Sequence, residues 1–425
     1  MNILAKTSLC AALVVLALLC PARLAKADVV LTWNEIAVRT LVQQGQNPFA
    51  QARLAAIVQL AVFEAVNAIT GEYEPYIGVT ALTGASPEAA AATAAYRVLK
   101  TYFPAAPNLV QAYAESLAAI SDGASKTNGI AAGEAAAAAM IANRQNDGSA
   151  PATVSAVGAP AAGVWQITLP PGCAATATGG AFYQWQNVRP FGVPDVVGFR
   201  PDPPPSLTST EFTKAYNEVK RVGSITSADR PQDRSDVARF YQASSPTLIF
   251  NLAARQVAEA QQRSLSENAR ALALLNMATS DSLVASFAAK YYYTFWRPEN
   301  AIRFLDFYGN SKTPPDPNYV PFISTPCFPS YPSNHASGSN GAAEILRRIY
   351  GEGGHAFTIA NPFNASVANM QFTYTTFNEM CNDVDDARVY GGIHFRFDQV
   401  AGNRLGRDVA TYVYKHNLRK ANGPE

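Results

Sequence analysis

The chain has 425 residues, with 33 basic and 32 acidic side chains and a formal net charge of +1. A charge this close to zero argues against nucleic acid or an anionic membrane surface as the partner. The length is enough to bury a large hydrophobic core, either in one large unit or in two domains.

The first 27 residues have the pattern of a secretory signal peptide. Lys6 supplies a positive charge, residues 9–20 form a nearly continuous apolar run, and Ala-Lys-Ala at 25–27 matches a cleavage site. The run is short for a membrane span, although an uncleaved anchor is the alternative. We predict a mature chain that starts at Asp28, carries 30 basic and 32 acidic side chains, has no membrane span, and is exported to the periplasm or the extracellular medium.

The segment 28–146 is expected to be an N-terminal helical region. Apolar residues recur at three- and four-residue steps over 50–70, and alanine-rich stretches with helical spacing follow at 86–120 and 129–145. The next segment, 147–206, is rich in Gly, Pro, Ala and Thr but also holds several aromatic residues. We interpret it as a long irregular connection that wraps a surface or covers a site.

Helical patterns return over 207–425, and strand-like alternation is scarce. Thr208 and Glu211 have the spacing of a capping box at the start of this part. The composition and periodicity therefore predict a mainly α protein with helices packed as bundles. The helices expected here cover 207–224, 231–243, 246–277, 280–305, 336–350, 366–380 and 383–416.

Two cations, Lys290 and Arg297, lie seven residues apart in one helical pattern, which predicts that they share a helix face two turns apart. Five of the six residues between them are aromatic, so we expect this helix to be buried. Buried cations need an anion. Glu64 and Asp236 are candidates for buried counter-charges, although we favour the interpretation that each is just partly exposed. The alternative for the two cations is a solvated helix face.

The segment Pro332-Ser333-Asn334-His335 is a turn that leads into an alanine- and glycine-rich helix, expected to begin near Ala336. Backbone N–H groups at a helix start bind anions, and Ser333 adds a hydroxyl donor. His335 can project towards the same anion. The alternative interpretation is an ordinary N-cap at Ser333 followed by a turn histidine.

A third motif contains Arg388, His394 and Asp398. The spacing of four lets Asp398 contact the imidazole of His394 and fix its tautomer, although an ordinary helix-surface pair has the same spacing. The other two histidines, His355 and His416, lack such company, and we interpret them as surface residues. Together the three motifs predict a site for a tetrahedral oxyanion, built from three cations, one hydroxyl and two imidazoles.

Three cysteines follow the predicted signal peptide: Cys173, Cys327 and Cys381. An odd number in an exported protein allows one disulfide and one free thiol. Cys327 lies six residues before Ser333 and Cys381 lies seven before Arg388, so these two come together if both motifs line one pocket. We predict a Cys327–Cys381 disulfide, with three buried free thiols as the alternative.

The three motifs, in this order and with these gaps, resemble the signature shared by vanadium-dependent haloperoxidases and type 2 phosphatidic acid phosphatases. Thirty-three residues separate Pro298 from Pro332, and 52 separate His335 from Arg388. The resemblance extends over nearly the whole mature chain and is greatest to the long, haloperoxidase-like branch. It implies an all-α fold of two helix-bundle-like halves, of the vanadium chloroperoxidase and acid phosphatase type, with the oxyanion at one end of the second half.

The resemblance also implies a role for each residue of the motifs. His394 would bond vanadium, His335 would act as acid and base, and Asp398 would complete the catalytic set. The vanadium would act as a Lewis acid that makes peroxide electrophilic towards halide. Phe328 matches a position near the halide. The vanadate oxygens would be held by Lys290, Arg297, Ser333, the backbone of Asn334, and Arg388.

Two positions depart from the signature. Asn334 stands where glycine is usual, and Ala387 stands where serine is usual. Asparagine tolerates a positive φ better than most residues, so we expect the turn to survive. The Asn334 side chain would crowd the pocket, add a donor, or simply fit, and we favour the last.

The leading hypothesis is a vanadium-dependent haloperoxidase-like enzyme that oxidises halide with hydrogen peroxide. The alternative is a soluble acid phosphatase that cleaves a phosphate monoester, with phosphate in the same pocket. His394 would then be the nucleophile that forms a phosphohistidine, and His335 would protonate the leaving alcohol. A third hypothesis is a non-catalytic oxyanion-binding protein. The same residues serve all three, and the halide, the organic substrate and the oligomeric state stay open.

Overall fold

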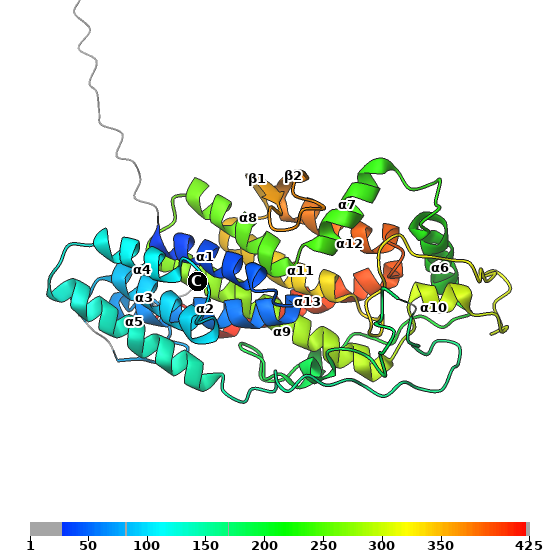
Figure 1. Cartoon of the computed structure of the whole chain (residues 1–425), viewed down its shortest axis with the longest axis horizontal. Helices are drawn as coiled ribbons and strands as arrows, with labels where there is room; N and C mark the ends of the chain where they lie inside the picture. Colours follow the sequence, from blue (N-terminus) through cyan, green and yellow to red (C-terminus); the bar gives the residue numbers. More distant parts are fainter. Residues whose placement is uncertain (1–27, 81–82, 169, 422–425) are drawn as a thin grey trace, which may run out of the picture.

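The computed structural model describes residues 28–80, 83–168 and 170–421. The predicted signal peptide, with its cleavage motif at 25–27, lies outside these residues. In the described part the chain forms thirteen α-helices and one two-stranded antiparallel sheet (Figure 1). The all-α fold class is therefore confirmed. The helices are α1 (Val29–Gln43), α2 (Pro48–Thr70), α3 (Pro87–Tyr102), α4 (Leu109–Ala118), α5 (Ala124–Asn143), α6 (Thr210–Gly223), α7 (Gln232–Ala243), α8 (Pro246–Ala260), α9 (Leu265–Tyr293), α10 (Pro298–Arg303), α11 (Asn334–Tyr350), α12 (Phe377–Tyr390) and α13 (Arg396–His416).

Two long helices, α2 and α9, pack against each other at the centre of the molecule. Helices α3 and α5 cover α2, whereas α11 and α13 pack on α9. Both central helices have the length and apolar composition of a membrane span, but 89% and 94% of their most apolar windows are buried inside the protein. Their hydrophobicity is accounted for by their place in the core, and the absence of a membrane span stays a prediction.

Helix α9 is continuous where the sequence suggested a break near residue 278. It begins with a capping box, in which the side chains of Ser264 and Glu267 each accept a hydrogen bond from the other residue's backbone N–H. It ends at Tyr293 because Thr294 adopts the left-handed conformation, with φ of 45°. The chain then turns into the short helix α10, which lies near α6 at the right-hand end of Figure 1.

The expected helix over 366–380 is wrong except for its last four residues, 377–380. Residues Gln371–Thr376 form strand β2, which pairs antiparallel with strand β1, Gly353–Ala360. The β2 sequence QFTYTT is rich in aromatic and β-branched residues, which favour a pleated, half-buried surface. Helix α12 begins only at Phe377, where Thr376 and Glu379 form a capping box.

Other boundaries also differ from the expectation, among them the stretch 246–277, which is divided between α8 and α9. The stretch 86–120 contains two helices, α3 and α4, and α1 was not expected from periodicity. Ser209, rather than Thr208, caps α6, because its side chain accepts a hydrogen bond from the backbone N–H of Phe212. The helix expected over 383–416 is interrupted between α12 and α13, and His394 lies in this interruption.

The segment 147–206 is irregular as expected, with only two short 3-10 helices in its described residues, Tyr183–Asn187 and Val197–Phe199. A buried carboxylate holds part of it against α9: Asp281 accepts hydrogen bonds from the backbone N–H groups of residues 191–193 at 2.7, 2.7 and 3.2 Å. The segment therefore wraps the core as an ordered connection. The division of the chain at residues 146 and 206 stays a prediction.

Candidate active site

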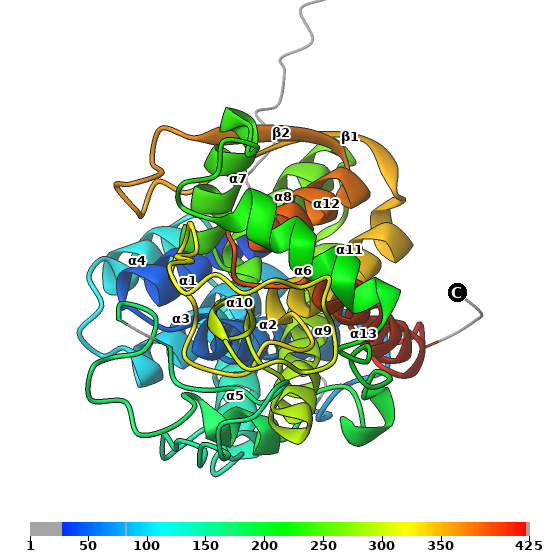
Figure 2. The ribbon, with the colours of Figure 1, turned by 90° about the vertical axis from the view of Figure 1, so that its right-hand side faces the viewer.

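Three stretches of chain meet at one end of α9: the α9–α10 connection, the segment that leads into α11, and the α12–α13 connection. Figure 2 views the molecule from this end, with α6, α7 and α10 towards the viewer. All the polar side chains predicted to bind an oxyanion or to catalyse come from these stretches. Those that are at most 2% exposed are Lys290, Arg297, Ser333, Arg388, His394 and Asp398.

Lys290 and Arg297 do not share a helix face, contrary to the prediction. Lys290 lies in the last turn of α9, whereas Arg297 is the residue before α10, beyond the turn at Thr294. Lys290 Nζ donates to the carbonyl oxygens of Pro329 and Ser330 at 3.0 and 2.6 Å. These bonds tie α9 to the segment before α11.

Arg297 joins the other two motifs. Its Nε donates to the carbonyl oxygen of Phe328 at 2.9 Å, and its Nη1 donates to that of Ile393 at 3.0 Å. The aromatic residues around it, which suggested burial from the sequence, do bury it completely: Arg297 is 0% exposed. The guanidinium thus fixes the segment that leads into α11 and the loop that carries His394.

No carboxylate forms an ion pair with Lys290, Arg297 or Arg388 within residues 28–80, 83–168 and 170–421. Nη2 of Arg297 and Nε of Arg388 are buried without any hydrogen-bond partner there. Burial, and then repulsion from Arg297, holds the pKa of Lys290 well below its usual range. Burial also lowers the pKa of Arg297 and of Arg388 to about 9. The three cations are therefore desolvated, and none is paired with a carboxylate in the described chain, although the charge of the nearby Asp398 opposes the lowering for Lys290 and Arg297.

The two proposed counter-charges lie elsewhere. The carboxylate of Glu64 accepts backbone N–H groups of residues 76–79 and so holds the turn after α2. Asp236 pairs with Gln232 and Arg239 near the surface. Neither is a counter-charge of the site: Glu64 is buried on backbone N–H groups, and Asp236 is partly exposed, as the alternative interpretation had it.

His394 contacts Asp398 as predicted, but it does so from the loop before α13 and not from within a helix. His394 Nδ1 lies 2.8 Å from Asp398 Oδ2, and Arg297 Nη1 lies 2.9 Å from His394 Nε2. Because a guanidinium can only donate, Nε2 must accept and Nδ1 must carry the proton that goes to Asp398. The lone pair of Nε2 therefore points to the side of Arg297.

Charges around His394 keep it neutral. Burial, followed by the charges of Arg297 and Lys290, holds its pKa well below its usual range. Burial also raises the pKa of Asp398 to about 6, although Ser330 and the nearby cations oppose this rise. At pH 7 the site thus holds a neutral imidazole whose orientation is set by a buried carboxylate.

Helix α11 begins at Asn334, two residues earlier than expected. Ser333 is its N-cap and accepts the backbone N–H of Ala336 at 3.3 Å, so its hydroxyl hydrogen stays available. Asn334 is helical and 5% exposed, and it is not among the residues with positive φ. Tolerance of a left-handed conformation is therefore not the reason that asparagine fits here.

His335 is half-buried beside the same cations. Burial, followed by the charges of Arg388, Lys290 and Arg297, holds its pKa well below its usual range. It is hydrogen-bonded to the backbone of Tyr241, whose carbonyl oxygen also lies 3.5 Å from Arg388 Nη1. The structure thus places His335 and His394 on one set of cations.

Phe328 covers the cations with its ring. The ring centroid lies 5.4 Å from Lys290 Nζ and 5.0 Å from Arg297 Cζ, and the side chain is 6% exposed. Rings of Phe49, Phe182 and Phe287 pack around it. The result is an apolar wall next to a strongly positive site.

Two contributors were missed by the sequence analysis. Ser330 donates to Asp398 Oδ2 at 2.5 Å, and its turn-rich surroundings gave no reason to single it out from Ser333. Tyr241 contributes a backbone carbonyl from the end of α7, and no side-chain motif reports a backbone group.

The predicted disulfide is wrong in one partner. Cys327 is bonded to Cys173, and Cys381 is a buried free thiol. The irregular segment runs beside Cys327, where the backbone N–H of Ala181 donates to the Cys327 carbonyl at 2.7 Å. Cys381 instead faces α11, where its Sγ lies 4.0 Å from the Ser339 carbonyl oxygen. The disulfide therefore fastens the irregular connection to the wall of the site.

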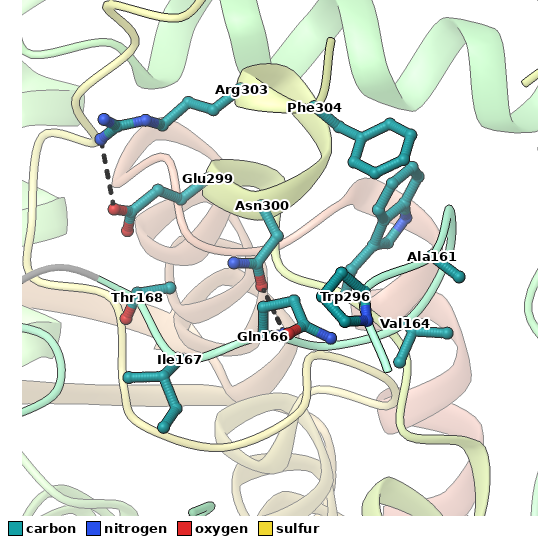
Figure 3. A pocket seen from close by; sticks show the side chains of 11 residues that line it. Ala161, Val164, Gln166, Ile167, Thr168, Trp296, Glu299, Asn300, Arg303 and Phe304 are labelled. Carbon is teal, nitrogen blue, oxygen red and sulfur yellow. Dashed lines mark hydrogen bonds and ion pairs between the residues drawn. The ribbon is translucent and has the colours of Figure 1, made fainter. Parts of the chain in front are cut away.

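A hollow of about 280 Å³ lies beside Trp296 and α10 (Figure 3). Its lining includes Trp296, Glu299, Asn300 and Gln166, and none of the predicted site residues is among its lining residues. Asn300 Oδ1 accepts the backbone N–H of Arg297 at 3.3 Å and that of Gln166 at 3.4 Å. The dashed line between Asn300 and Gln166 in Figure 3 marks the second of these bonds. Asn300 therefore supports the backbone of Arg297, but the hollow is not part of the predicted oxyanion site.

Comparison with known proteins matches these features to one family. Residues 270–423 match the model of the VCPO second helical-bundle domain. Vanadium chloroperoxidase of Curvularia inaequalis is 26% identical over 184 residues, which are 36% of this chain and 30% of that protein. The match thus spans less than a third of this relative's length.

Two solved structures share the fold over most of the chain. The crystal structure of the first bacterial vanadium-dependent iodoperoxidase has a TM-score of 0.76 and 22% identity, and covers 93% of this chain and 98% of that one. The apo-type bacterial vanadium-dependent chloroperoxidase has a TM-score of 0.69 and 16% identity, and covers 87% and 95%. At these identities the likeness concerns the fold.

Proposed function

Because the chain belongs to the superfamily of the vanadium haloperoxidases, we propose that it is a vanadium-dependent haloperoxidase-like enzyme. It would oxidise halide with hydrogen peroxide at a vanadate held by His394. The observation that carries this proposal is the group of three buried cations that lack a carboxylate partner in the described chain and surround a neutral imidazole.

The residues present fit a vanadate group. Nη2 of Arg297 and Nε of Arg388 are buried N–H donors without a partner in the described chain, and such donors are costly to leave unsatisfied. Ser333 keeps a hydroxyl hydrogen to donate, and α11 adds its N-terminal N–H groups. Lys290 supplies the third positive charge. These donors would hold the oxygens, and His394 would bond the central atom through Nε2 in place of its present bond with Arg297.

When bound, the vanadate would supply a Lewis-acid centre that activates hydrogen peroxide towards halide. The cations Lys290, Arg297 and Arg388 would stabilise negative charge as it develops on the oxygens, in a site from which water is largely excluded. Phe328 presents an apolar surface beside them, which would help to desolvate a halide.

His335 is suited to move protons. Its pKa is held below the usual range, so at neutral pH it is unprotonated and can accept a proton from an incoming peroxide. His394 keeps its own proton on Nδ1, bound to Asp398, and therefore does not compete for this task. The two imidazoles would thus have separate roles, one as ligand and one as base.

A paired assay on the purified full chain tests the proposal. One arm contains orthovanadate, hydrogen peroxide and bromide or iodide with a halogen-accepting dye, and the other contains p-nitrophenyl phosphate without vanadate. We expect halogenation above the blank in the first arm, and inhibition when phosphate competes with vanadate. Halide oxidation at the blank rate together with cleavage of the phosphate ester would replace this proposal by the phosphatase alternative. Inactivity in both arms would leave the oxyanion-binding alternative.

The roles of the two histidines are tested by substitution of His335. We expect His335→Ala to bind vanadate nearly as well as the wild type but to turn over roughly 10²- to 10⁴-fold more slowly, which is the usual range for a lost acid–base group. Loss of vanadate affinity equal to that of His394→Ala would show that the roles are wrongly assigned.

Export to the periplasm or the extracellular medium is part of the proposal. The Cys173–Cys327 disulfide supports it, because disulfides persist in oxidising compartments. N-terminal sequencing of the protein recovered outside the cytoplasm should start at Asp28. A chain recovered in the cytoplasm with its first 27 residues intact would contradict this part.

A further inference from the structure

Ser330 is completely buried in the segment before α11, and each of its polar groups bonds a different part of the site. Its backbone N–H donates to the carbonyl of Phe295 at 2.9 Å, and its carbonyl accepts Lys290 Nζ at 2.6 Å. Its hydroxyl lies 2.5 Å from Asp398 Oδ2 and 3.2 Å from His394 Nδ1. One residue therefore contacts the α9 cation and the His394–Asp398 pair.

The direction of the Ser330 hydroxyl bond follows from Arg297. Since Arg297 donates to His394 Nε2, His394 Nδ1 carries a hydrogen and cannot accept one. The Ser330 hydroxyl must then donate to Asp398, which is also the shorter of its two contacts. Asp398 Oδ2 thus accepts from Ser330, from His394 and from the backbone N–H of Phe395 at 3.1 Å.

All of these bonds fall on one oxygen of Asp398. Its other oxygen, Oδ1, is buried and has no hydrogen-bond partner in the part of the chain that the structure describes. A carboxylate with one crowded and one empty oxygen can rotate unless a donor fixes it. Of the three donors to Asp398 Oδ2, His394 and Phe395 lie in the α12–α13 connection, next to Asp398 in the chain. Ser330 comes from the segment before α11, so its bond links Asp398 to the rest of the site.

We propose that Ser330 is a positioning residue: it fixes the Asp398 carboxylate on His394 Nδ1 and so, together with Arg297 on Nε2, keeps His394 in the Nδ1–H tautomer. The benefit for oxyanion binding rests on the proposed function. The effect on the His394 tautomer does not, because it is a property of the protein alone.

Two variants test this inference. Ser330→Ala removes the hydroxyl but keeps the carbonyl that binds Lys290, and Ser330→Cys leaves a weak donor of similar size. Ser339→Ala is the matched control, because the Ser339 hydroxyl is also buried but has no hydrogen-bond partner in the described residues. Thermal unfolding shows which variants fold, and Ser330→Cys serves if Ser330→Ala does not.

The first readout is the ¹⁵N chemical shift of the His394 ring nitrogens in vanadate-free protein at pH 7. The wild type and Ser339→Ala should show one Nδ1–H tautomer, whereas Ser330→Ala should show a mixture, with Ser330→Cys between them. A wild-type Nε2–H tautomer, or an unchanged pattern in Ser330→Ala, would overturn the inference.

The second readout is vanadate affinity by equilibrium dialysis. Ser330→Ala should bind roughly 10- to 100-fold more weakly than the wild type, the range for the loss of a group that orients a ligand, and Ser339→Ala should bind normally. Equal affinity of Ser330→Ala and wild type would also overturn the inference. If the wild type binds no vanadate but the tautomer still changes in Ser330→Ala, the proposed function fails while the role of Ser330 in orienting His394 stands.

Discussion

The protein buries two clusters of cations, and they differ in whether a carboxylate belongs to the cluster. Arg53 and Arg144 share Asp147, with Nε of Arg53 at 2.7 Å and Nη2 of Arg144 at 2.9 Å from Asp147 Oδ2. Lys290, Arg297 and Arg388 are as deeply buried but have no carboxylate partner among the described residues. We call them the paired cluster and the open cluster.

The paired cluster is a structural joint. It connects α2 to the end of α5 and to the irregular connection, where Arg144 Nη1 donates to the Pro190 carbonyl at 3.1 Å. Burial alone would raise the pKa of Asp147, but the bonds and charges of Arg53 and Arg144 lower it below its usual value. In the open cluster the charge of Asp398 only partly offsets the burial of Lys290 and Arg297, and no carboxylate pairs with a cation among the described residues, so an anion from outside can complete the cluster. The comparison shows that an incomplete set of charges marks a binding site, whereas a complete set marks a joint.

The largest effect is expected in the paired cluster. Asp147→Asn leaves two buried guanidinium groups without a counter-charge, so the free energy of unfolding should fall by about 3–5 kcal/mol. Urea unfolding measures this change. The vanadate affinity of the folded variant should stay at the wild-type level. A loss of affinity as large as that of open-cluster variants would break the distinction between the clusters.

The open cluster should respond in the opposite sense. Among the described residues Arg388 has a single weak hydrogen bond, at 3.5 Å to the Tyr241 carbonyl, and burial lowers its pKa. Arg388→Met should therefore leave the vanadate-free protein as stable as the wild type, or stabilise it by about 1–2 kcal/mol. Its vanadate affinity should fall by about 10²-fold, as expected when a charged hydrogen bond is lost. Strong destabilisation of the vanadate-free variant would mean that Arg388 has a structural role.

The two sites should also differ in the pH at which their contribution to the stability of the protein is lost. The pKa of His335 and that of His394 are held below the usual range, so below about pH 6.5 the unfolded chain binds more protons than the folded one. Their contribution to stability is present above that pH and is lost as the pH falls, by up to about 1.4 kcal/mol per pH unit for each histidine. The pKa of Asp147 is lowered, so its contribution is lost only below about pH 4.

Unfolding free energies of the vanadate-free protein between pH 7 and 5 measure this separation. The slope should be smaller in His335→Gln than in the wild type, and Asp147→Asn should keep the wild-type slope. Equal slopes in the wild type and His335→Gln would show that the histidines are not buried in the neutral form.

The smallest effect is expected at Asn334. Its side chain is nearly buried, and its backbone is helical, so glycine's wider range of φ is not needed. If the side chain merely fits, Asn334→Gly should bind vanadate within about twofold of the wild type and turn over at least as fast. Weakening by about 0.5–1.5 kcal/mol would instead identify the amide as an oxyanion donor. A gain of more than tenfold in either activity would show that Asn334 blocks the site.

The sequence predicted which residues gather at the site better than which helices and loops carry them. Spacing brought His394 to Asp398, and aromatic neighbours indicated the burial of Arg297. The helix shared by Lys290 and Arg297 was wrong, because the left-handed turn at Thr294 has no strong sequence signal. The partner of Cys327 was wrong because it depends on the path of an irregular segment, which periodicity does not describe.

The secondary structure also shows that features which depend on tertiary contacts are not predicted from the sequence. Long helices such as α2 are predicted well because their apolar periodicity and their caps agree. Strand β2 was missed because its six residues gain stability from pairing with β1, which is a tertiary contact. Ser330 and the Tyr241 carbonyl were missed for the same reason, since their roles depend on the elements that pack against them.

Vanadate binding to the wild type and to His394→Ala, measured by equilibrium dialysis at pH 7 with phosphate as competitor, tests the central claim most directly. The proposed site predicts one vanadate for each wild-type chain, displaced by phosphate, and no tight binding in His394→Ala, because the imidazole that would bond the central atom is gone. Absence of saturable binding to the wild type, or equally tight binding to His394→Ala, would contradict the claim that these unpaired cations and this imidazole form an oxyanion site.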